Sequence, residues 1–228
     1  MKQTQSGFTL IEIAIVLVII GLLLGGVLKG QELINSAKVK NLATDFRNIP
    51  ILIYGYQDKF RALPGDDGAA STHVSGTNAS TPASSLGNGM IDGLWDSITK
   101  TDESYLFWQH VRLAGLTTGT TTIPGTPAHG DGYLPLNANG GEIGIQSNNA
   151  SFVTITKNSA GSNSAMTGTY IICSKGILGK FVKQLDVTLD DGNTDTGSMR
   201  TADPVTAGQS MDQTKISDGQ TYTVCMGV

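Results

Sequence analysis

Residues 1–28 read MKQTQSGFTLIEIAIVLVIIGLLLGGVL, a short polar leader followed directly by an apolar run. An ordinary secretory signal has its apolar stretch before the cleavage site and is removed with it. Here the order is reversed, so a cut after Gly7 would leave the apolar run on the mature chain. The run from Phe8 to Leu28 contains 21 residues, and as an α-helix it would span about 31 Å, the thickness of a bilayer core. We therefore expect a transmembrane helix at residues 8–28, after a leader at residues 1–7.

Glu12 is the only charged residue within this apolar run. A charged side chain in a membrane segment costs roughly 2.5–3.5 kcal/mol on insertion scales, and such residues usually serve a function. We therefore take Glu12 as a candidate functional residue.

The sequence Gly7-Phe8-Thr9-Leu10-Ile11-Glu12 before an aliphatic run resembles the prepilin leader of type IV pilins and of type II secretion pseudopilins. The resemblance is strong over residues 5 to about 60 and weaker beyond. It implies cleavage between Gly7 and Phe8 by a prepilin peptidase, methylation of the new Phe8 amine, and packing of the helices into a filament core. It also implies that the Glu12 carboxylate pairs with the Phe8 ammonium, within the subunit or of a neighbour. The alternative is an uncleaved membrane anchor carrying a soluble domain.

An amphipathic segment follows at residues 29–61. Apolar residues recur there at steps of three and four, which is typical of one face of a helix; they are Val39, Leu42, Phe46, Ile49, Ile53, Tyr56 and Phe60. The sequence Leu63-Pro64-Gly65 is a helix-ending signal. We therefore expect one helix from the membrane to about Arg61, with its apolar stripe packed on a globular domain at residues 62–228.

That domain combines long polar loops with short segments rich in β-branched residues. Residues 65–90 read as a long loop and residues 102–116 as a helix, while residues 178–185 fit either a short helix or a strand. The candidate strands are Glu142–Gln146, Phe152–Thr156, Thr169–Cys173 and Thr221–Cys225. We therefore predict an α+β fold, a long N-terminal helix on a small antiparallel β-sheet with long loops. This architecture agrees with the pilin fold that the resemblance implies.

The composition favours an extracytoplasmic domain. Charged residues make up 15% of the chain, against about 25% in average soluble proteins. Neutral polar residues replace them, as in loop-rich extracellular domains. The formal net charge is −4, which gives no electrostatic reason to expect binding to nucleic acid.

Cys173 and Cys225 are the two cysteines of the chain. They have no CxxC spacing and no nearby histidine, whereas a structural zinc site needs four ligands in close pairs. We interpret them as a disulfide formed outside the cytoplasm, which would close a loop of about fifty residues and contribute on the order of 4 kcal/mol. Pilins resemble this chain in carrying such a C-terminal disulfide, which pseudopilins commonly lack.

The distribution of basic residues favours the opposite orientation in the membrane. Lys2 precedes the apolar run, whereas Lys29, Lys38 and Lys40 follow it. The positive-inside rule alone would place the C-terminal side in the cytoplasm. The cysteine pair and the resemblance outweigh this count in our interpretation.

The sequence contains no catalytic motif such as HExxH, GxSxG or a P-loop, so we do not predict an enzyme. His110 is expected to be a satisfied helix residue, with His73 and His129 in loops. Residues 88–93 (NGMIDG) have some oxygen ligands of a calcium loop but lack its spaced carboxylates and distal glutamate, so we expect a turn. The Asp66-Asp67 pair is expected to cap loop amides.

A second acidic loop is a candidate calcium site. Asp190, Asp191, Asn193 and Asp195 place four oxygen-bearing side chains around Gly192, and calcium takes six to eight oxygen ligands. Some pseudopilins carry calcium in a C-terminal loop, so the resemblance adds support. The alternative is an Asp-Gly turn between two elements. No cofactor is otherwise required.

The sequence therefore predicts a structural subunit, a major or minor pilin, of a type IV pilus-like filament. The partners implied are copies of itself, other pilins, the prepilin peptidase and the inner-membrane assembly machinery. Such a subunit resides in the inner membrane before assembly and in an extracellular pilus or a periplasmic pseudopilus afterwards. The nearest alternative is a pseudopilin of a type II secretion system. An alternative of another class is a membrane-anchored periplasmic binding module or hydrolase.

Overall fold

The computed structural model describes residue 7 and residues 9–80, 86–149 and 155–228. The chain divides into two units, residues 1–38 and residues 39–228, and each is described by itself. Helix α1 (Leu10–Phe60) supplies the helical part of the first unit and the first element of the second.

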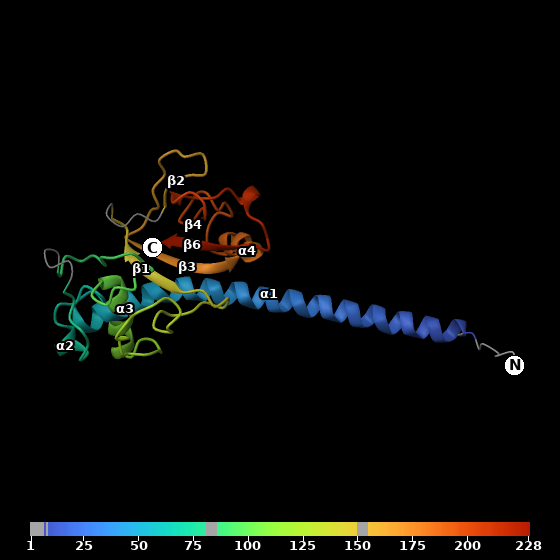
Figure 1. The fold of residues 1–228 in the computed structure, drawn as a ribbon, viewed down its shortest axis with the longest axis horizontal. Helices are drawn as coiled ribbons and strands as arrows, with labels where there is room; N and C mark the ends of the chain where they lie inside the picture. The colour runs from blue at the N-terminus through green and yellow to red at the C-terminus, as the bar shows by residue number, and fades with distance from the viewer. Residues whose placement is uncertain (1–6, 8, 81–85, 150–154) are drawn as a thin grey trace. The chain divides into compact units, whose positions relative to one another are not determined.

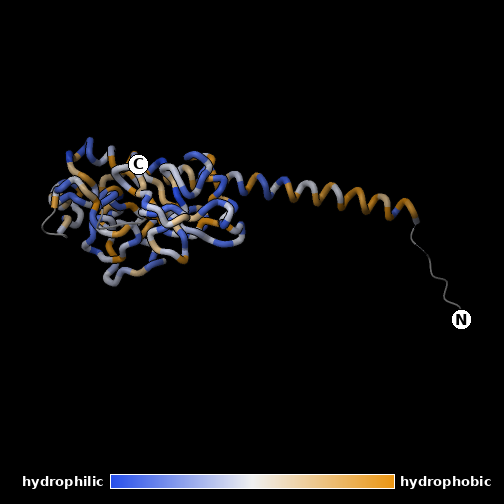
Figure 2. Tube along the Cα trace, turned by 90° about the horizontal axis from the view of Figure 1, so that it is seen from above, coloured by the Kyte–Doolittle hydropathy of each residue, from blue (hydrophilic) through white to orange (hydrophobic). Residues whose placement is uncertain are grey.

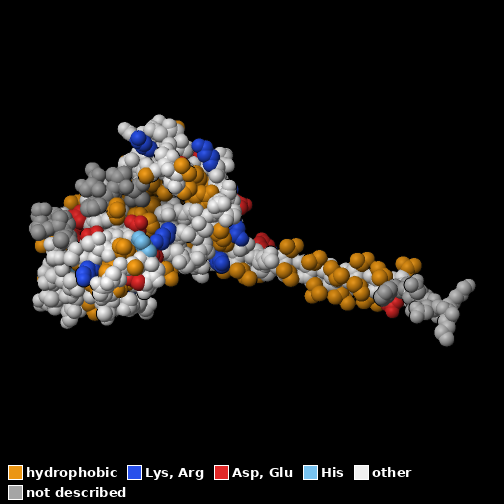
Figure 3. All heavy atoms as spheres, in the orientation of Figure 1, with side chains coloured by type: hydrophobic (Ala, Val, Ile, Leu, Met, Phe, Trp, Pro, Cys, Tyr) orange, Lys and Arg blue, Asp and Glu red, His pale blue; other side chains and the backbone are white. Residues whose placement is uncertain are grey.

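From Leu10 to Leu28, α1 is apolar on all sides apart from Glu12. All its Leu, Ile and Val side chains from Leu10 to Leu28 are exposed in the isolated subunit. Figures 2 and 3 show the hydrophobic residues gathered along this part of the helix. A soluble helix would leave one face polar, so this pattern requires an apolar environment.

In the second unit, α1 is buried along one face. The buried residues repeat at helical spacing and are Val39, Leu42, Ala43, Phe46, Ile49, Ile53 and Tyr56. The predicted stripe is therefore confirmed, with Phe60 half-buried at its end. Arg61 then adopts a positive φ of 55°, a left-handed conformation that ends the helix.

A four-stranded antiparallel sheet lies beside this part of α1 in the order β1-β3-β6-β4 (Figure 1). The strands are β1 (Ile143–Ser147), β3 (Tyr170–Leu178), β6 (Thr221–Gly227) and β4 (Met199–Thr201). Side chains of α1, α3 and the sheet form one hydrophobic core, with Ile145 and Ile172 paired across β1 and β3. The predicted α+β, pilin-like fold is confirmed.

Three further α-helices and a short 3₁₀ helix complete the described fold. Helix α3 (Glu103–Leu113) is almost wholly buried, and α4 (Gly179–Leu189) resolves the choice left open for residues 178–185 in favour of a helix. The loop expected at residues 65–90 contains the short helix α2 (Ala70–His73), and a 3₁₀ turn lies at Gln213–Lys215.

A second, two-stranded sheet was not predicted. Strand β2 (Ile155–Lys157) pairs in parallel with β5 (Gly208–Gln209), apart from the four-stranded sheet. The predicted strand Phe152–Thr156 overlaps β2, but residues 152–154 lie outside the described residues. Strands β4 and β5 were missed because they are three and two residues long, so pairing rather than residue preference defines them.

Candidate functional site

Glu12 lies in the first turn of α1 and bonds with Thr9, which directly precedes the helix. The Thr9 N–H and hydroxyl donate to Glu12 Oε2 at 2.8 and 2.7 Å, and the Glu12 N–H donates to Thr9 Oγ1 at 3.3 Å. This reciprocal arrangement is a capping box. The Thr-x-x-Glu spacing makes it readable in the sequence, although only the charge of Glu12 was used to select that residue.

The capping box leaves part of the Glu12 carboxylate available. Both bonds from Thr9 use Oε2, and among the described residues no hydrogen bond reaches Oε1. The side chain is exposed in the isolated subunit. Glu12 can therefore begin the helix and still accept a second, charged donor.

Gly7 lies just before the helix and is exposed, and apart from its chain neighbours no atom of the described residues lies within 4 Å of the place where a Cβ would stand. Phe8 lies outside the described residues. The predicted cleavage at Gly7–Phe8, the methylation of Phe8 and its pairing with Glu12 therefore stay predictions.

Within the described residues, α1 is the one helix long and apolar enough to cross a membrane, judged by length and composition. Residues 2–28 match the family model of the prokaryotic N-terminal methylation motif. This motif is that of a type IV prepilin leader with the apolar helix that follows it. The prepilin leader implies processing by a prepilin peptidase and assembly with other pilins. No curated protein and no solved structure matches the chain.

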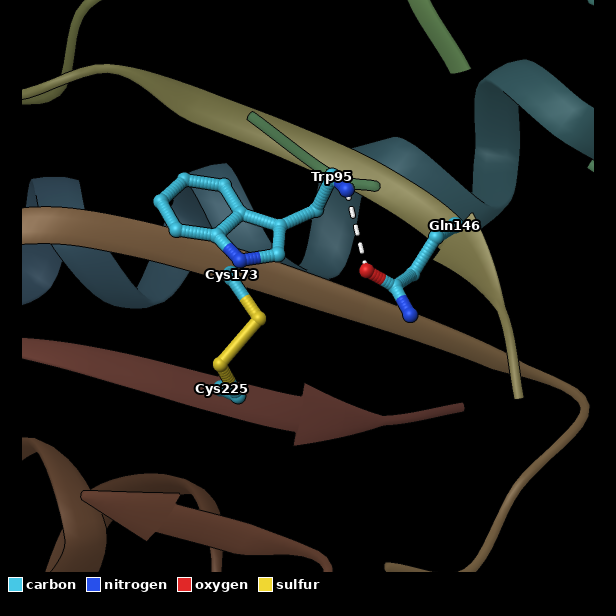
Figure 4. Close-up of a disulfide and its surroundings, with 4 residues drawn as sticks. All are labelled: Trp95, Gln146, Cys173 and Cys225. Carbon is cyan, nitrogen blue, oxygen red and sulfur yellow. Dashed lines mark hydrogen bonds between the residues drawn. A yellow bond between two sulfur atoms is a disulfide. The ribbon is translucent and has the colours of Figure 1, made fainter. Parts of the chain in front are cut away.

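The two cysteines form a disulfide between the central strands of the sheet. Cys173 of β3 lies directly opposite Cys225 of β6, and both are fully buried. The Trp95 side chain packs beside the bond, and its backbone N–H donates to Gln146 Oε1 at 2.9 Å (Figure 4). The bond therefore ties the C-terminal strand to the middle of the sheet.

Two members of the predicted calcium loop join a third carboxylate. Ligand oxygens of Asp186, Asp190 and Asp191 lie within 4.8 Å of one another. Asp186 is buried, and neither of its carboxylate oxygens makes a hydrogen bond within the described residues. Burial, with the charges of Asp190 and Asp191, raises the pKa of Asp186 to about 7. This cluster is the part of the loop that could hold a cation.

The other two predicted ligands point elsewhere. Asp195 accepts bonds from the Ser159 N–H at 2.6 Å and from the hydroxyls of Ser159 and Ser210 at 2.7 and 2.5 Å. Asn193 Oδ1 accepts from the Asp195 N–H at 3.2 Å. Asp186 was missed because it lies in α4, four residues before Asp190 and directly after residues 178–185, whose helical nature was left open.

The histidines have structural partners. His110 Nδ1 accepts from the Gly65 N–H at 3.0 Å, so its Nε2–H donates to the Thr77 carbonyl at 2.7 Å. Burial lowers the pKa of His110, which keeps the ring neutral in this tautomer, and the expected satisfied helix residue is confirmed. His73, expected in a loop, is the last residue of α2 and pairs with Asp67, whereas His129 pairs with Glu142.

Proposed function

We propose that the chain is a structural subunit, a major or minor pilin, of a type IV pilus-like filament. The observation that carries this proposal is a prepilin leader continuous with an apolar helix exposed on all sides. Burying one Leu, Ile or Val side chain contributes about 1.5–3 kcal/mol. The helix therefore favours the bilayer before assembly and the packed helices of a filament afterwards.

In this proposal, Glu12 selects the position of a new subunit. Its carboxylate is the only charge between Leu10 and Leu28, and it retains one oxygen, Oε1, beyond the one bonded to Thr9. An unpaired charge in a low-dielectric filament core is costly, whereas a matched one can fix register. The matching charge is the Phe8 ammonium that processing would create, in the same subunit or a neighbour.

The proposed location follows from the leader and the disulfide. Processing and assembly would occur at the inner membrane, with prepilin peptidase and the assembly machinery as partners. Disulfides persist in oxidising compartments, so the Cys173–Cys225 bond supports a globular unit outside the cytoplasm. The assembled filament would then be extracellular.

A pseudopilin of a type II secretion system is the second candidate. The acidic cluster of Asp186, Asp190 and Asp191 favours it, because some pseudopilins hold calcium in a C-terminal loop. The disulfide favours the pilin. No described feature favours a membrane-anchored binding module or hydrolase.

Intact mass measurement of the membrane-extracted protein tests the processing step. We expect the chain to begin at Phe8 with one added methyl group, and Gly7→Arg to leave the precursor uncut because the peptidase requires a small residue before the cut. Gly7→Ala is the matched control and should still be processed. A mature protein that retains Met1 in both wild type and Gly7→Ala would contradict the proposal.

A further inference from the structure

Asp45 is a partly buried carboxylate of α1 that has no partner. It lies in the globular unit, beside the buried stripe of the helix. Among the described residues, its carboxylate forms no salt bridge and accepts no hydrogen bond. Burial raises the pKa of Asp45 to about 6, and no nearby donor or cation opposes this shift. The ionised side chain therefore destabilises the isolated subunit at neutral pH.

Two more deeply buried carboxylates of the same unit show the usual compensation. Asp67 accepts from the Tyr56 hydroxyl at 2.7 Å, and Glu142 forms a salt bridge with Lys175. Opposite charges and hydrogen-bond donors favour the ionised form of a carboxyl group. Asp45 lacks both inside the subunit, so a compensating group would have to come from outside it.

A hollow beside Asp45 has room for such a group. It has a volume of about 300 Å³ and lies between α1 and the loop before β1, lined by Asn41, Thr44, Asp45 and residues 136–138. Leu136 is 55% exposed and gives the hollow an apolar wall. Lysine combines an aliphatic stem with a charged end. The hollow matches both parts, with Leu136 for the stem and Asp45 for the ammonium group.

The chain itself offers suitable lysines. Lys40, Lys100 and Lys157 are exposed and form no salt bridge within the part of the chain that the structure describes. Every arginine, in contrast, has a hydrogen-bonding or ionic partner. Assembly with other pilins, which the leader implies, would bring many copies of these lysines close to α1 of neighbouring subunits.

We propose that, in the filament, the Asp45 carboxylate pairs with a lysine ammonium group of a neighbouring copy of this chain. This inference rests on the proposed function, and it adds a second charged contact far from Glu12. The contact is heterologous, because the hollow of one copy meets a different surface of the next. Heterologous contacts generate open helical filaments when the rotation between copies does not close a ring.

The variant Asp45→Asn tests the pairing through two measurements on the full chain. In urea unfolding of the detergent-dispersed subunit at pH 7.5, the variant should be at least as stable as wild type, because an unpaired, partly buried charge has been removed. Filament yield after shearing should fall by about tenfold or more, since loss of one member of a desolvated ion pair weakens association by at least that factor. A purely structural residue would instead lower both quantities.

Asp58→Asn is the matched control. Asp58 lies on the same helix, but its side chain is 86% exposed and it pairs with Arg61 at 3.7 Å, so its loss should change neither measurement. Normal filament yield from Asp45→Asn would overturn the inference while leaving the proposed function intact. Reduced stability together with reduced yield would also overturn it. An absence of filaments in wild type would contradict the proposed function itself, and this inference with it.

Cross-linking of wild-type filaments identifies the partner. A water-soluble carbodiimide activates a carboxylate, and a lysine amine in contact with it then forms an amide. Peptide mapping of the linked dimer should show Asp45 joined to a lysine of this chain, and detergent-dispersed subunits should give no such dimer. A linkage from Asp45 to a different protein, or dimers in which Asp45 is unlinked, would overturn the assignment of the partner.

Discussion

Glu12 has two roles, and a single substitution can remove both at once. Its carboxylate caps the first turn of α1 through Thr9, and in our proposal its charge pairs with the Phe8 ammonium of the same or a neighbouring subunit. A Glu12→Leu variant removes both, so a failure to assemble would not identify the cause. Variants that separate charge from capping are therefore needed.

Glu12→Gln and Thr9→Ala make this separation. Glutamine can replace glutamate in a capping box, so Glu12→Gln keeps the cap and loses the charge. Thr9→Ala keeps the charge and weakens the cap at a cost of about 1 kcal/mol. We expect Glu12→Gln to abolish or sharply reduce filament yield and Thr9→Ala to reduce it little, as measured by shearing and immunoblotting against the processed membrane pool. Normal filaments from Glu12→Gln would remove the assembly role of the charge.

The burial of His110 leads us to expect that the stability of the folded protein depends on pH. Burial holds the pKa of native His110 below that of an unfolded histidine, so the unfolded state binds more protons as the pH falls below about 6.5. Stability contributed by the neutral ring is therefore present above this pH and is lost on acidification, by at most about 1.4 kcal/mol per pH unit.

The variant His110→Gln isolates this contribution. Glutamine offers an acceptor for the Gly65 N–H and a donor for the Thr77 carbonyl, but it does not titrate. Urea unfolding from pH 7 to pH 5 should give a steeper loss of stability for wild type than for the variant. Parallel curves would show that His110 is not the group responsible.

At the scale of elements, the buried stripe of α1 organises the globular unit. Phe46 is fully buried in the main core, whereas Ile51 on the same helix is 63% exposed. Phe46→Ala should lower the free energy of unfolding by about 3–5 kcal/mol, and the matched control Ile51→Ala by less than about 1 kcal/mol. Denaturant unfolding of the full chain in detergent measures both. Similar losses would mean that the stripe does not dominate the packing.

The helices and strands also show which parts of the fold can be predicted from local sequence patterns. The stripe from Val39 to Tyr56 was predictable because its repeat of three and four residues is a direct consequence of helix geometry. The two central strands were predictable from β-branched residues ending in the paired cysteines. The Met199–Thr201 strand was not, because its identity depends on pairing with β6, which no local pattern records.

The candidate sites were predictable to a smaller extent. The leader and Glu12 could be identified because the residues that define them are adjacent in the sequence. Asp186 required knowledge that α4 is a helix, and the bonds of Asp195 to Ser159 and Ser210 required the tertiary fold. Sites assembled from distant segments are therefore visible only in the structure.

At the scale of the whole molecule, the chain joins a membrane-type helix to a globular α+β unit stabilised by a disulfide. The leader marks the first part for processing, and the second part carries the acidic cluster of Asp186, Asp190 and Asp191. In the proposed filament, assembly would depend on the N-terminal helix, and the globular unit would form the filament surface.

The central claim is that this chain is a processed subunit of a filament. The most direct test is to shear filaments from cells that express the chain at its native level and to measure the intact masses of their subunits. We predict filaments that contain this chain beginning at Phe8, with the Cys173–Cys225 bond intact. Recovery of the chain in the membrane fraction alone, with none in sheared or periplasmic filaments, would contradict the account.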